Sequence, residues 1–345
     1  MAILAPPWFE LPPDGYGGIE SMVADLAGAL VERGHEVTLI GAGASETTAR
    51  FFPTYAEAPS ERIGEPMPEV LHAAQAAQEL ARIDPDIVHD HTLAGPLTAD
   101  GRGSPTLLTA HGPTEGELGE YYRQMGASVH LAAISDAQRA KMPDLNWAGV
   151  IYNGIDVPSF PLREDKEDWV LWLGRFSPEK GARQAVEAAR ASGRRIVLAG
   201  KLSEEFEREY FDSQVKPLLG PDAEYIGEAD AEAKRDLLSR ARCLVFPIQW
   251  DEPFGLVMVE AMACGTPVVT LRRGAAPEVV QDGVTGFVLD SVAGFPEAVE
   301  AAGRLDPAGC RAHVERKFSV PVMAEGYERL YRKLVAPREG EPPGF

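Results

Sequence analysis

Residues 251–267 read Asp-Glu-Pro-Phe-Gly-Leu-Val-Met-Val-Glu-Ala-Met-Ala-Cys-Gly-Thr-Pro. The runs on either side, at 243–247 and 267–271, are short, apolar and bounded by turn residues, which is typical of buried strands. Between them, residues 256–263 have the composition of a helix. A strand, a glycine-containing turn, a helix and a second strand form one unit of a parallel sheet.

The same alternation of strand and helix runs through the whole chain in two series. In the first series we predict strands at 2–5, 36–40, 86–89, 106–110, 130–134 and 150–152, with helices at 19–30 and 70–81. In the second we predict strands at 169–173, 196–199, 224–226, 243–247, 267–271 and 286–289, with helices at 182–191, 204–219, 230–239, 256–263 and 276–281. The fold class is therefore α/β, with two Rossmann-like, doubly wound domains.

The prolines and charges after residue 157 mark the boundary between the two domains. We expect an N-terminal Rossmann-like domain at 1–157 and a C-terminal one at 158–319. An amphipathic helix follows at 320–335. Residues 336–345 are rich in Pro, Gly and charge, which predicts a flexible tail.

The charge balance excludes several classes of partner. The chain carries 33 Lys and Arg against 53 Asp and Glu, a net charge of −20. Residues 1–140 contain seven Arg, no Lys and 20 acidic residues, a net charge of −13. Nucleic acids and anionic membranes both attract basic surfaces, so we expect neither as a partner. The three cysteines form no CxxC pair, and the sequence shows neither a signal peptide nor a membrane span, so we expect a cytoplasmic protein.

Two carboxylates in the deciding stretch point to a ligand that carries hydroxyl groups. Glu252 precedes the helix and Glu260 lies in its second turn, so the two can flank one elongated ligand. Carboxylates accept paired hydrogen bonds from the vicinal hydroxyls of a sugar or ribose. The free N–H groups of Phe254, Gly255 and Leu256 would face an anion between them. Because the neighbours of Glu260 are apolar, this carboxylate needs a partner.

Two further motifs follow the first predicted strand of each domain. Residues 174–181 place Arg175 at a strand end and Lys180 at a helix start, a pair of cations suited to a diphosphate. Residues 15–20 contain Gly17 and Gly18 before a helix, where backbone N–H groups can approach a ligand closely. Glu20 stands where the dinucleotide fingerprint requires Gly or Ala, which disfavours a dehydrogenase.

Together these motifs resemble the signature of family 4 retaining glycosyltransferases with the GT-B fold. The resemblance rests on Glu252 and Glu260 in an E-x₇-E arrangement within Pro-Phe-Gly-Leu-Val-Met-Val-Glu-Ala-Met-Ala-Cys-Gly-Thr-Pro-Val, and it covers essentially the whole chain. The other matching segments are Gly17-Gly18, residues 110–112 (Ala-His-Gly), 152–156 (Tyr-Asn-Gly-Ile-Asp), 174–181, 276–280 (Ala-Pro-Glu-Val-Val) and 282–286 (Asp-Gly-Val-Thr-Gly). Among members, the compact, acidic sequence is most similar to actinomycete enzymes that decorate antibiotics, of the avilamycin type.

The resemblance implies a role for each matching residue. Arg175 and Lys180 would neutralise the donor diphosphate, Glu260 would hold the ribose, and Glu252 would contact the hydroxyls of the donor sugar. The amides of Gly17 and Gly18 would meet the distal phosphate from the opposite domain, and His111 would lie near the donor sugar. The strand end at Tyr225, Ile226 and Gly227 would read the base. The fold implies two domains facing across a cleft, with the last helix crossing back onto the N-terminal domain.

Metal binding is the weaker interpretation of two acidic or histidine-containing segments. His89-Asp90-His91 is a possible ligand set, but side chains alternate between the faces of a strand, so we expect a structural role. Residues 84–86 (Asp-Pro-Asp) lie between a helix and a strand, which favours a connector. Since two cations and a helix N-terminus can neutralise a diphosphate, we expect neither a metal nor another cofactor.

These observations predict transfer of a sugar, with retention, from a nucleotide donor to a soluble small-molecule or oligosaccharide acceptor. UDP is the nucleotide that the resemblance favours. Acceptor contacts are expected from the loops at 46–66 and 112–124. Two alternatives stay open: a nucleotide-sugar epimerase on the same fold, and a non-catalytic nucleotide-sugar-binding subunit.

Overall fold

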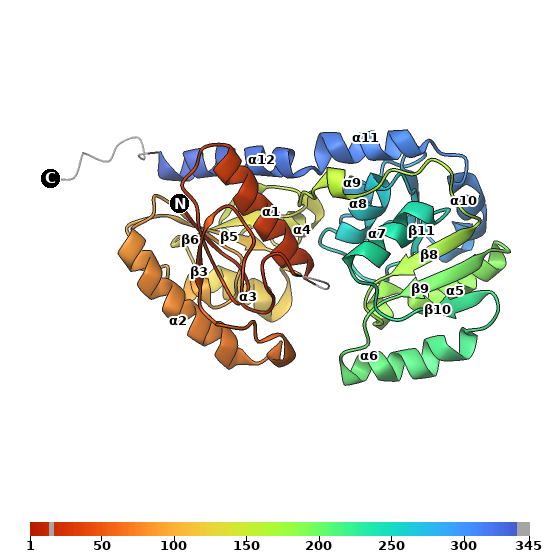
Figure 1. The fold of residues 1–345 in the computed structure, drawn as a ribbon, viewed down its shortest axis with the longest axis horizontal. Coiled ribbons are helices and arrows are strands. Elements are labelled where there is room, and N and C mark those ends of the chain that lie inside the picture. Colours follow the sequence, from red (N-terminus) through yellow and green to blue (C-terminus); the bar gives the residue numbers. More distant parts are fainter. Residues whose placement is uncertain (14–16, 337–345) are drawn as a thin grey trace.

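Runs of buried aliphatic residues form two parallel sheets, one in each lobe of the molecule (Figure 1). The computed structural model describes residues 1–13 and 17–336. In this part of the chain the first sheet has seven strands: β1 (Ala2–Leu4), β2 (Thr38–Gly41), β3 (Arg50–Pro53), β4 (Val88–Asp90), β5 (Thr106–Ala110), β6 (Val129–Ala133) and β7 (Trp147–Val150). The second, within the same described residues, has six: β8 (Trp169–Leu173), β9 (Arg195–Ala199), β10 (Ala223–Tyr225), β11 (Leu244–Phe246), β12 (Val268–Leu271) and β13 (Gly286–Leu289).

The strand order confirms that both sheets are doubly wound. The first runs β3-β2-β1-β4-β5-β6-β7 and the second β10-β9-β8-β11-β12-β13, with every pair parallel. In each sheet the order reverses beside the first strand, between β1 and β4 and between β8 and β11. A ligand of such a sheet binds outside the carboxyl ends of the strands at this switch point.

Helices cover both sheets. They are α1 (Gly18–Glu32), α2 (Pro66–Ile83), α3 (Gly116–Gln124), α4 (Asp136–Lys141), α5 (Ala182–Ala191), α6 (Glu205–Tyr210), α7 (Ala231–Arg240), α8 (Leu256–Ala263), α9 (Ala276–Val279), α10 (Phe295–Ala302), α11 (Pro307–Lys317) and α12 (Val320–Val335). The helical spacing predicted for α1 is confirmed, since Met22, Val23, Leu26 and Leu30 are all buried.

The last two helices connect the lobes. α11 packs against α8 in the second lobe, and α12 packs against α1 in the first (Figure 1). Tyr327 of α12 belongs to the same buried cluster as Ile3 and Leu26. On the same helix, the Glu328 carboxylate accepts hydrogen bonds from Arg33 at 2.8 Å and from His35 at 2.7 Å. The described residues therefore begin and end in the same lobe, and the predicted tail lies, apart from Ala336, outside them.

Five elements were not predicted from the sequence: β3, α3, α4, α10 and α11. Two of them, β3 and α3, lie in the segments expected as acceptor-contacting loops. β7 ends at Val150, where the predicted strand begins. β3 is the half-exposed edge strand of its sheet and contains both Arg50 and Pro53, so it lacks the buried run that marks a central strand.

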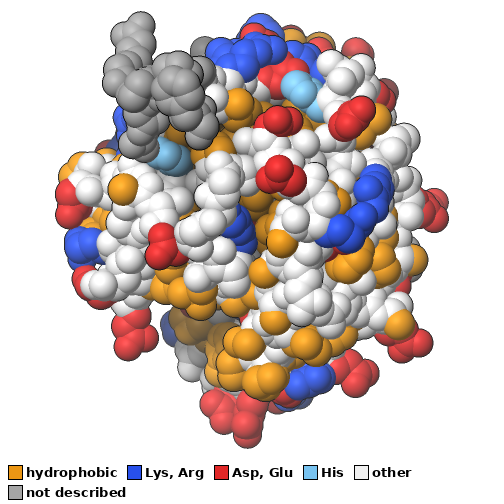
Figure 2. All heavy atoms as spheres, turned by 90° about the vertical axis from the view of Figure 1, so that its left-hand side faces the viewer, with side chains coloured by type: hydrophobic (Ala, Val, Ile, Leu, Met, Phe, Trp, Pro, Cys, Tyr) orange, Lys and Arg blue, Asp and Glu red, His pale blue; other side chains and the backbone are white. Residues whose placement is uncertain are grey.

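Over the visible, described residues, the outer end of the first lobe carries no single basic patch. Figure 2 shows Lys and Arg side chains in small separate groups over this face, between Asp and Glu side chains. Within residues 1–13 and 17–336, no helix combines the length and apolar character needed to cross a bilayer.

Candidate active site

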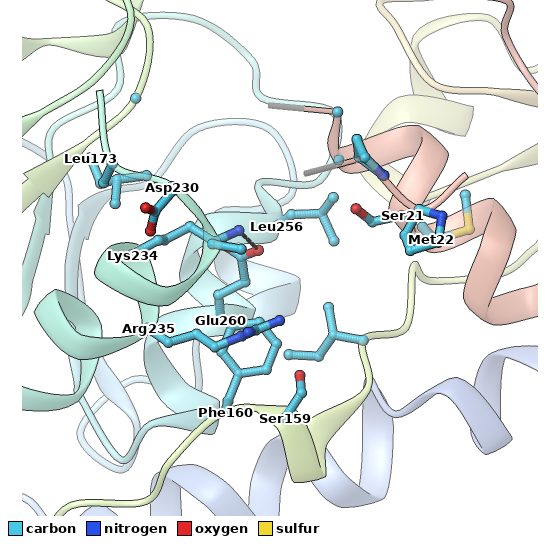
Figure 3. Close-up of a pocket in the computed structure, with 18 of the residues that line it drawn as sticks. Ser21, Met22, Ser159, Phe160, Leu173, Asp230, Lys234, Arg235, Leu256 and Glu260 are labelled. Atoms are coloured by element: carbon cyan, nitrogen blue, oxygen red, sulfur yellow. Dashed lines mark hydrogen bonds and ion pairs between the residues drawn. The ribbon is translucent and has the colours of Figure 1, made fainter. Parts of the chain in front are cut away.

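A cavity of about 420 Å³ lies between the lobes, at the carboxyl ends of the strands (Figure 3). Both lobes contribute to its wall. Gly17 and Gly18 line it from the start of α1, while Arg175 follows β8 and Leu256 and Glu260 come from α8. Five of the residues predicted for the site are thus brought together at the two switch points.

Glu260 has the partner that its apolar surroundings required. Its carboxylate accepts a hydrogen bond from Lys234 Nζ of α7 at 2.6 Å, and this pair is drawn in Figure 3. The Glu260 side chain is 13% exposed and that of Lys234 27% exposed. Both residues line the cavity, so a ligand there would meet a carboxylate whose charge is balanced by a neighbouring ammonium.

Lys180 and Glu252 form a second pair, outside the lining of this cavity. Lys180 Nζ lies 2.5 Å from Glu252 Oε2, and Trp250 Nε1 donates to the same carboxylate at 3.0 Å. The ammonium also lies 5.2 Å from the centre of a Trp250 ring. Glu252 lines a much smaller recess between the lobes, beside Glu115 and Asp251.

The two predicted diphosphate cations have different environments. Arg175 is exposed toward the cavity, with its guanidinium 3.8 Å from the Glu207 carboxylate. The Lys180 ammonium forms an ion pair with the Glu252 carboxylate. In the described part of the chain the two cations do not line one cavity together, so their joint action on an anion stays a prediction.

The turn before α8 depends on glycine. Gly255 is the N-cap residue and has φ +84°, and a Cβ there would lie 2.5 Å from Met258 Cε. The Phe254 side chain is buried against Tyr152 and Phe318. Phe254 and Gly255 do not line the cavity, so any contact they make with an anion would involve their backbone N–H groups.

Gly17 and Gly18 of the first lobe let the backbone lie closer to neighbouring atoms than a residue with a Cβ would allow. Gly17 has φ +144°, and a Cβ there would lie 2.8 Å from Pro13 Cγ. A Cβ on Gly18 would lie 3.1 Å from Leu256 Cδ1 of the opposite lobe. Burial raises the pKa of Glu20, in the first turn of α1, to about 7. Residues 15 and 16 of this motif lie outside the described residues.

The predicted base-reading strand end lies next to the cavity rather than in its wall. The Tyr225 hydroxyl donates to Gly200 O at 3.0 Å, and Gly200 N donates to Gly227 O at 2.9 Å. Ile226 is 43% exposed. Gly200 does line the cavity, so the segment at 225–227 holds a cavity residue in place.

The histidine segment follows the alternation of an extended chain. His89 and His91 lie on one side, with ring centres 4.1 Å apart, because residues two apart in an extended chain share a face. Asp90, between them, points to the other face. His91 Nδ1 lies 2.9 Å from Nε2 of His111, which does not line the cavity. Within the described residues, no group of three or more His, Cys, Asp or Glu side chains could hold a metal ion.

Several charged residues that line the cavity were not predicted from the sequence, three of them on helices. Lys234 and Arg235 come from α7, and Asp25 comes from α1. Burial, and then the nearby carboxylate of Asp156, raises the pKa of Asp25 to about 6. The sequence did contain a signal for the two basic residues: they are adjacent and lie in a helix with Asp230 as its N-cap, which follows a strand end.

Helix α4 of the first lobe contacts the second lobe at both of its ends. The Glu278 carboxylate of α9 accepts hydrogen bonds from the backbone N–H groups of Asp136 and Ala137, at 2.8 and 2.7 Å. Lys141, at the other end of α4, pairs with Asp251 at 2.5 Å. Both ends of a helix of the first lobe are therefore anchored to the second.

Comparison with known proteins identifies the family. The family described as Glycosyl transferases group 1 matches residues 157–302, and Glycosyltransferase Family 4 matches residues 16–158. The α-maltose-1-phosphate synthase of Mycobacterium tuberculosis is 30% identical over 95% of this chain and 98% of its own. The chain belongs to the group 1 glycosyltransferases. A phosphatidyl-myo-inositol mannosyltransferase of Mycolicibacterium smegmatis is 29% identical, over 83% of this chain and 79% of its own.

Solved structures agree on the GT-B fold of this glycosyltransferase. AviGT4, a glycosyltransferase involved in avilamycin A biosynthesis, is 30% identical, with a TM-score of 0.76 over 98% of both chains. HepE from Anabaena, in complex with UDP-glucose, has a TM-score of 0.74 at 18% identity, over 97% of this chain and 100% of its own. The resemblance to the family and the predicted fold class are both confirmed.

Proposed function

We propose that this glycosyltransferase transfers a sugar from a UDP-linked donor to a soluble small-molecule or oligosaccharide acceptor, with retention of anomeric configuration. The observation that carries the proposal is the cavity between the lobes, where Arg175 and Glu260 face Gly17 and Gly18. A cation suits a diphosphate, a carboxylate suits ribose hydroxyls, and exposed amides suit a phosphate. The UDP-glucose bound to HepE supports this donor, and the pathway of AviGT4 supports a natural-product acceptor.

The proposed mechanism is attack from the face that the diphosphate leaves, through an oxocarbenium-like state. The acceptor oxygen bonds to the anomeric carbon as the bond to the diphosphate oxygen breaks, and the leaving phosphate takes the acceptor proton. Arg175, Lys180 and the N–H groups at the start of α8 would stabilise the departing charge. A covalent route needs a free carboxylate beneath the anomeric carbon. Glu252 is engaged by Lys180 and Trp250, which disfavours it as that nucleophile.

Incubation with labelled nucleotide sugar, with and without acceptor, tests the proposal against its alternatives. Transfer to the acceptor supports a glycosyltransferase reaction, and NMR of the product decides retention or inversion. Isomerisation of the donor without acceptor would instead indicate an epimerase. Binding without turnover would indicate a nucleotide-sugar-binding subunit. Thermal shifts with the common nucleoside diphosphates identify the base.

We expect activity to survive EDTA. The Arg175 guanidinium lines the cavity, and the Lys180 ammonium is the second cation expected to act on the diphosphate. Two such groups can neutralise a diphosphate without a metal. Initial rates with and without EDTA, on protein passed through a chelating resin, measure this directly. Complete loss in EDTA, restored by added Mg²⁺ or Mn²⁺, would contradict the metal-free mechanism.

We also expect no docking on anionic membranes. Each basic residue near an anionic leaflet contributes about 1 kcal/mol of attraction, and acidic residues oppose it. Residues 1–140 carry a net charge of −13, and Figure 2 shows basic side chains in separate groups on one face of this lobe. Co-sedimentation with phosphatidylserine vesicles, beside neutral vesicles as the control, measures this. Strong binding that salt weakens would show that the acceptor can be a membrane lipid.

A further inference from the structure

Three histidines and two tyrosines form one connected group between β4, β5 and α12. His89 Nδ1 lies 2.7 Å from the Tyr331 hydroxyl, and His89 Nε2 lies 2.7 Å from Thr109 Oγ1. The His89 ring packs against His91, and the Tyr327 hydroxyl lies 3.0 Å from Thr109 Oγ1. Helix α12 therefore contacts His89 through Tyr331, and His89 in turn packs against the ring of His91.

His91 connects this group to His111. Its Nδ1 lies 2.9 Å from His111 Nε2, and the two rings are stacked with centres 5.2 Å apart. Burial lowers the pKa of His111 to about 4 and holds the pKa of His91 well below its usual value. At neutral pH both rings are uncharged, so one of the two facing nitrogens donates a proton and the other accepts it.

The other nitrogen of His91 decides the direction of this hydrogen bond. Among the described residues, His91 Nε2 is buried and has no hydrogen-bond partner. If His111 donated from Nε2, the neutral ring of His91 would have to carry its proton on its own Nε2, as a buried donor without an acceptor. Orphaned buried N–H groups are rarer in folded proteins than acceptors left without a donor. His91 therefore donates from Nδ1.

We propose that His91 is a positioning residue that fixes His111 in the tautomer protonated at Nδ1. His111 Nε2 then accepts the hydrogen bond from His91 with its lone pair. The proton of the His111 ring is on Nδ1, which faces away from His91. In this state His111 can donate a hydrogen bond through Nδ1 but cannot act as a general base. The proposal rests on the proposed function only in the expectation that the donor sugar extends from the cavity toward His111, where the N–H of this ring would hold a hydroxyl or ring oxygen.

The tautomer is measured directly by long-range ¹H–¹⁵N correlation NMR on ¹⁵N-histidine-labelled protein at neutral pH. His111→Asn and His91→Asn assign the signals by their loss. We expect Nδ1 of His111 to carry the proton and Nε2 to show the shift of an unprotonated nitrogen. A His111 ring protonated at Nε2, an even mixture of tautomers or an imidazolium would each overturn the proposal. This readout needs no substrate, so it holds whether or not the proposed reaction is correct.

Kinetics then test whether the tautomer matters. Asparagine can present an amide N–H close to the place of Nδ1, whereas leucine cannot. We expect His91→Leu to lower kcat about tenfold, the equivalent of one lost hydrogen bond, and His91→Asn to retain most of it, with little change in KM for the donor. Equal losses of kcat in the two variants, or no loss in either, would overturn the assigned role.

His72 provides the matched control. Its ring is buried, as that of His91 is, and its Nδ1 lies 2.7 Å from Thr54 Oγ1. His72→Leu should therefore lower the melting temperature as His91→Leu does, because both remove a buried polar ring. Only the His91 variant should change kcat. A similar fall in kcat for His72→Leu would show that the kinetic effect comes from general destabilisation.

Discussion

Replacing Lys180 with methionine is expected to lower turnover by about ten- to a hundredfold and to destabilise the protein at the same time. The ammonium is the one proposed to stabilise the leaving diphosphate, and a hydrogen bond to a charged group contributes about 1.5–3 kcal/mol. The same ammonium lies 2.5 Å from the Glu252 carboxylate, whose side chain is only 10% exposed. Without Lys180, that carboxylate keeps the N–H of Trp250 but loses its counter-charge.

The double variant Lys180→Met/Glu252→Gln separates the two effects. It removes the uncompensated charge, so the melting temperature should recover toward that of the parent protein. Turnover should stay below that of the single variant Glu252→Gln, because the cation is also absent. Recovery of both properties would show that Lys180 serves only to neutralise Glu252, and would remove it from the diphosphate site.

Arg175→Ala is the companion to this experiment. Arg175 is largely exposed to the cavity and its nearest carboxylate lies 3.8 Å away, so its removal should cost little stability. We expect weaker binding of the nucleoside diphosphate without a large change in melting temperature. An unchanged dissociation constant would place the diphosphate elsewhere.

Strands in the second lobe could be predicted closely because most of them are short runs of largely buried residues. Residues 169–173 and 286–289 were predicted as strands, and β8 and β13 have these bounds. α3 was missed for a physical reason: only Gly119 and Tyr122 of its nine residues are buried, so no apolar stripe marks it. A Cβ at Gly119 would lie 2.2 Å from Thr114 O, so the close packing of this helix depends on a residue that disfavours helices.

Residues of the site could be predicted only where a contiguous sequence motif marks them. Glu252 and Glu260 stand out because carboxylates are unusual beside an apolar helix. Their partners could not be predicted, since Lys180 lies 72 residues from Glu252 and Lys234 lies 26 residues from Glu260. The first contact forms because β8 and β11 are neighbours in the sheet, and the second because α7 packs against α8. The placement of Glu260 in the cavity and of Glu252 outside it is likewise a property of the folded chain.

Because Glu260 lines the cavity and Glu252 does not, we expect their replacement to affect the affinity for UDP differently. Glu260→Ala should weaken binding of free UDP by about ten- to a hundredfold, because a charged acceptor for the ribose hydroxyls is lost from the cavity wall. Glu252→Ala should leave free UDP binding nearly unchanged, since its carboxylate lines a separate recess, but should reduce transfer from the nucleotide sugar. Titration calorimetry with UDP, followed by initial rates with the nucleotide sugar, measures both.

Lys234 supplies the control for this comparison. Glu260→Ala also leaves the Lys234 ammonium without its partner at 2.6 Å, and a free cation in the cavity could attract the diphosphate and mask the loss. The double variant Glu260→Ala/Lys234→Met removes this compensation and should bind UDP no better than Glu260→Ala alone. Equal losses of UDP affinity in Glu252→Ala and Glu260→Ala would show that the carboxylates share one function, and the assignment of ribose to one and donor sugar to the other would then be wrong.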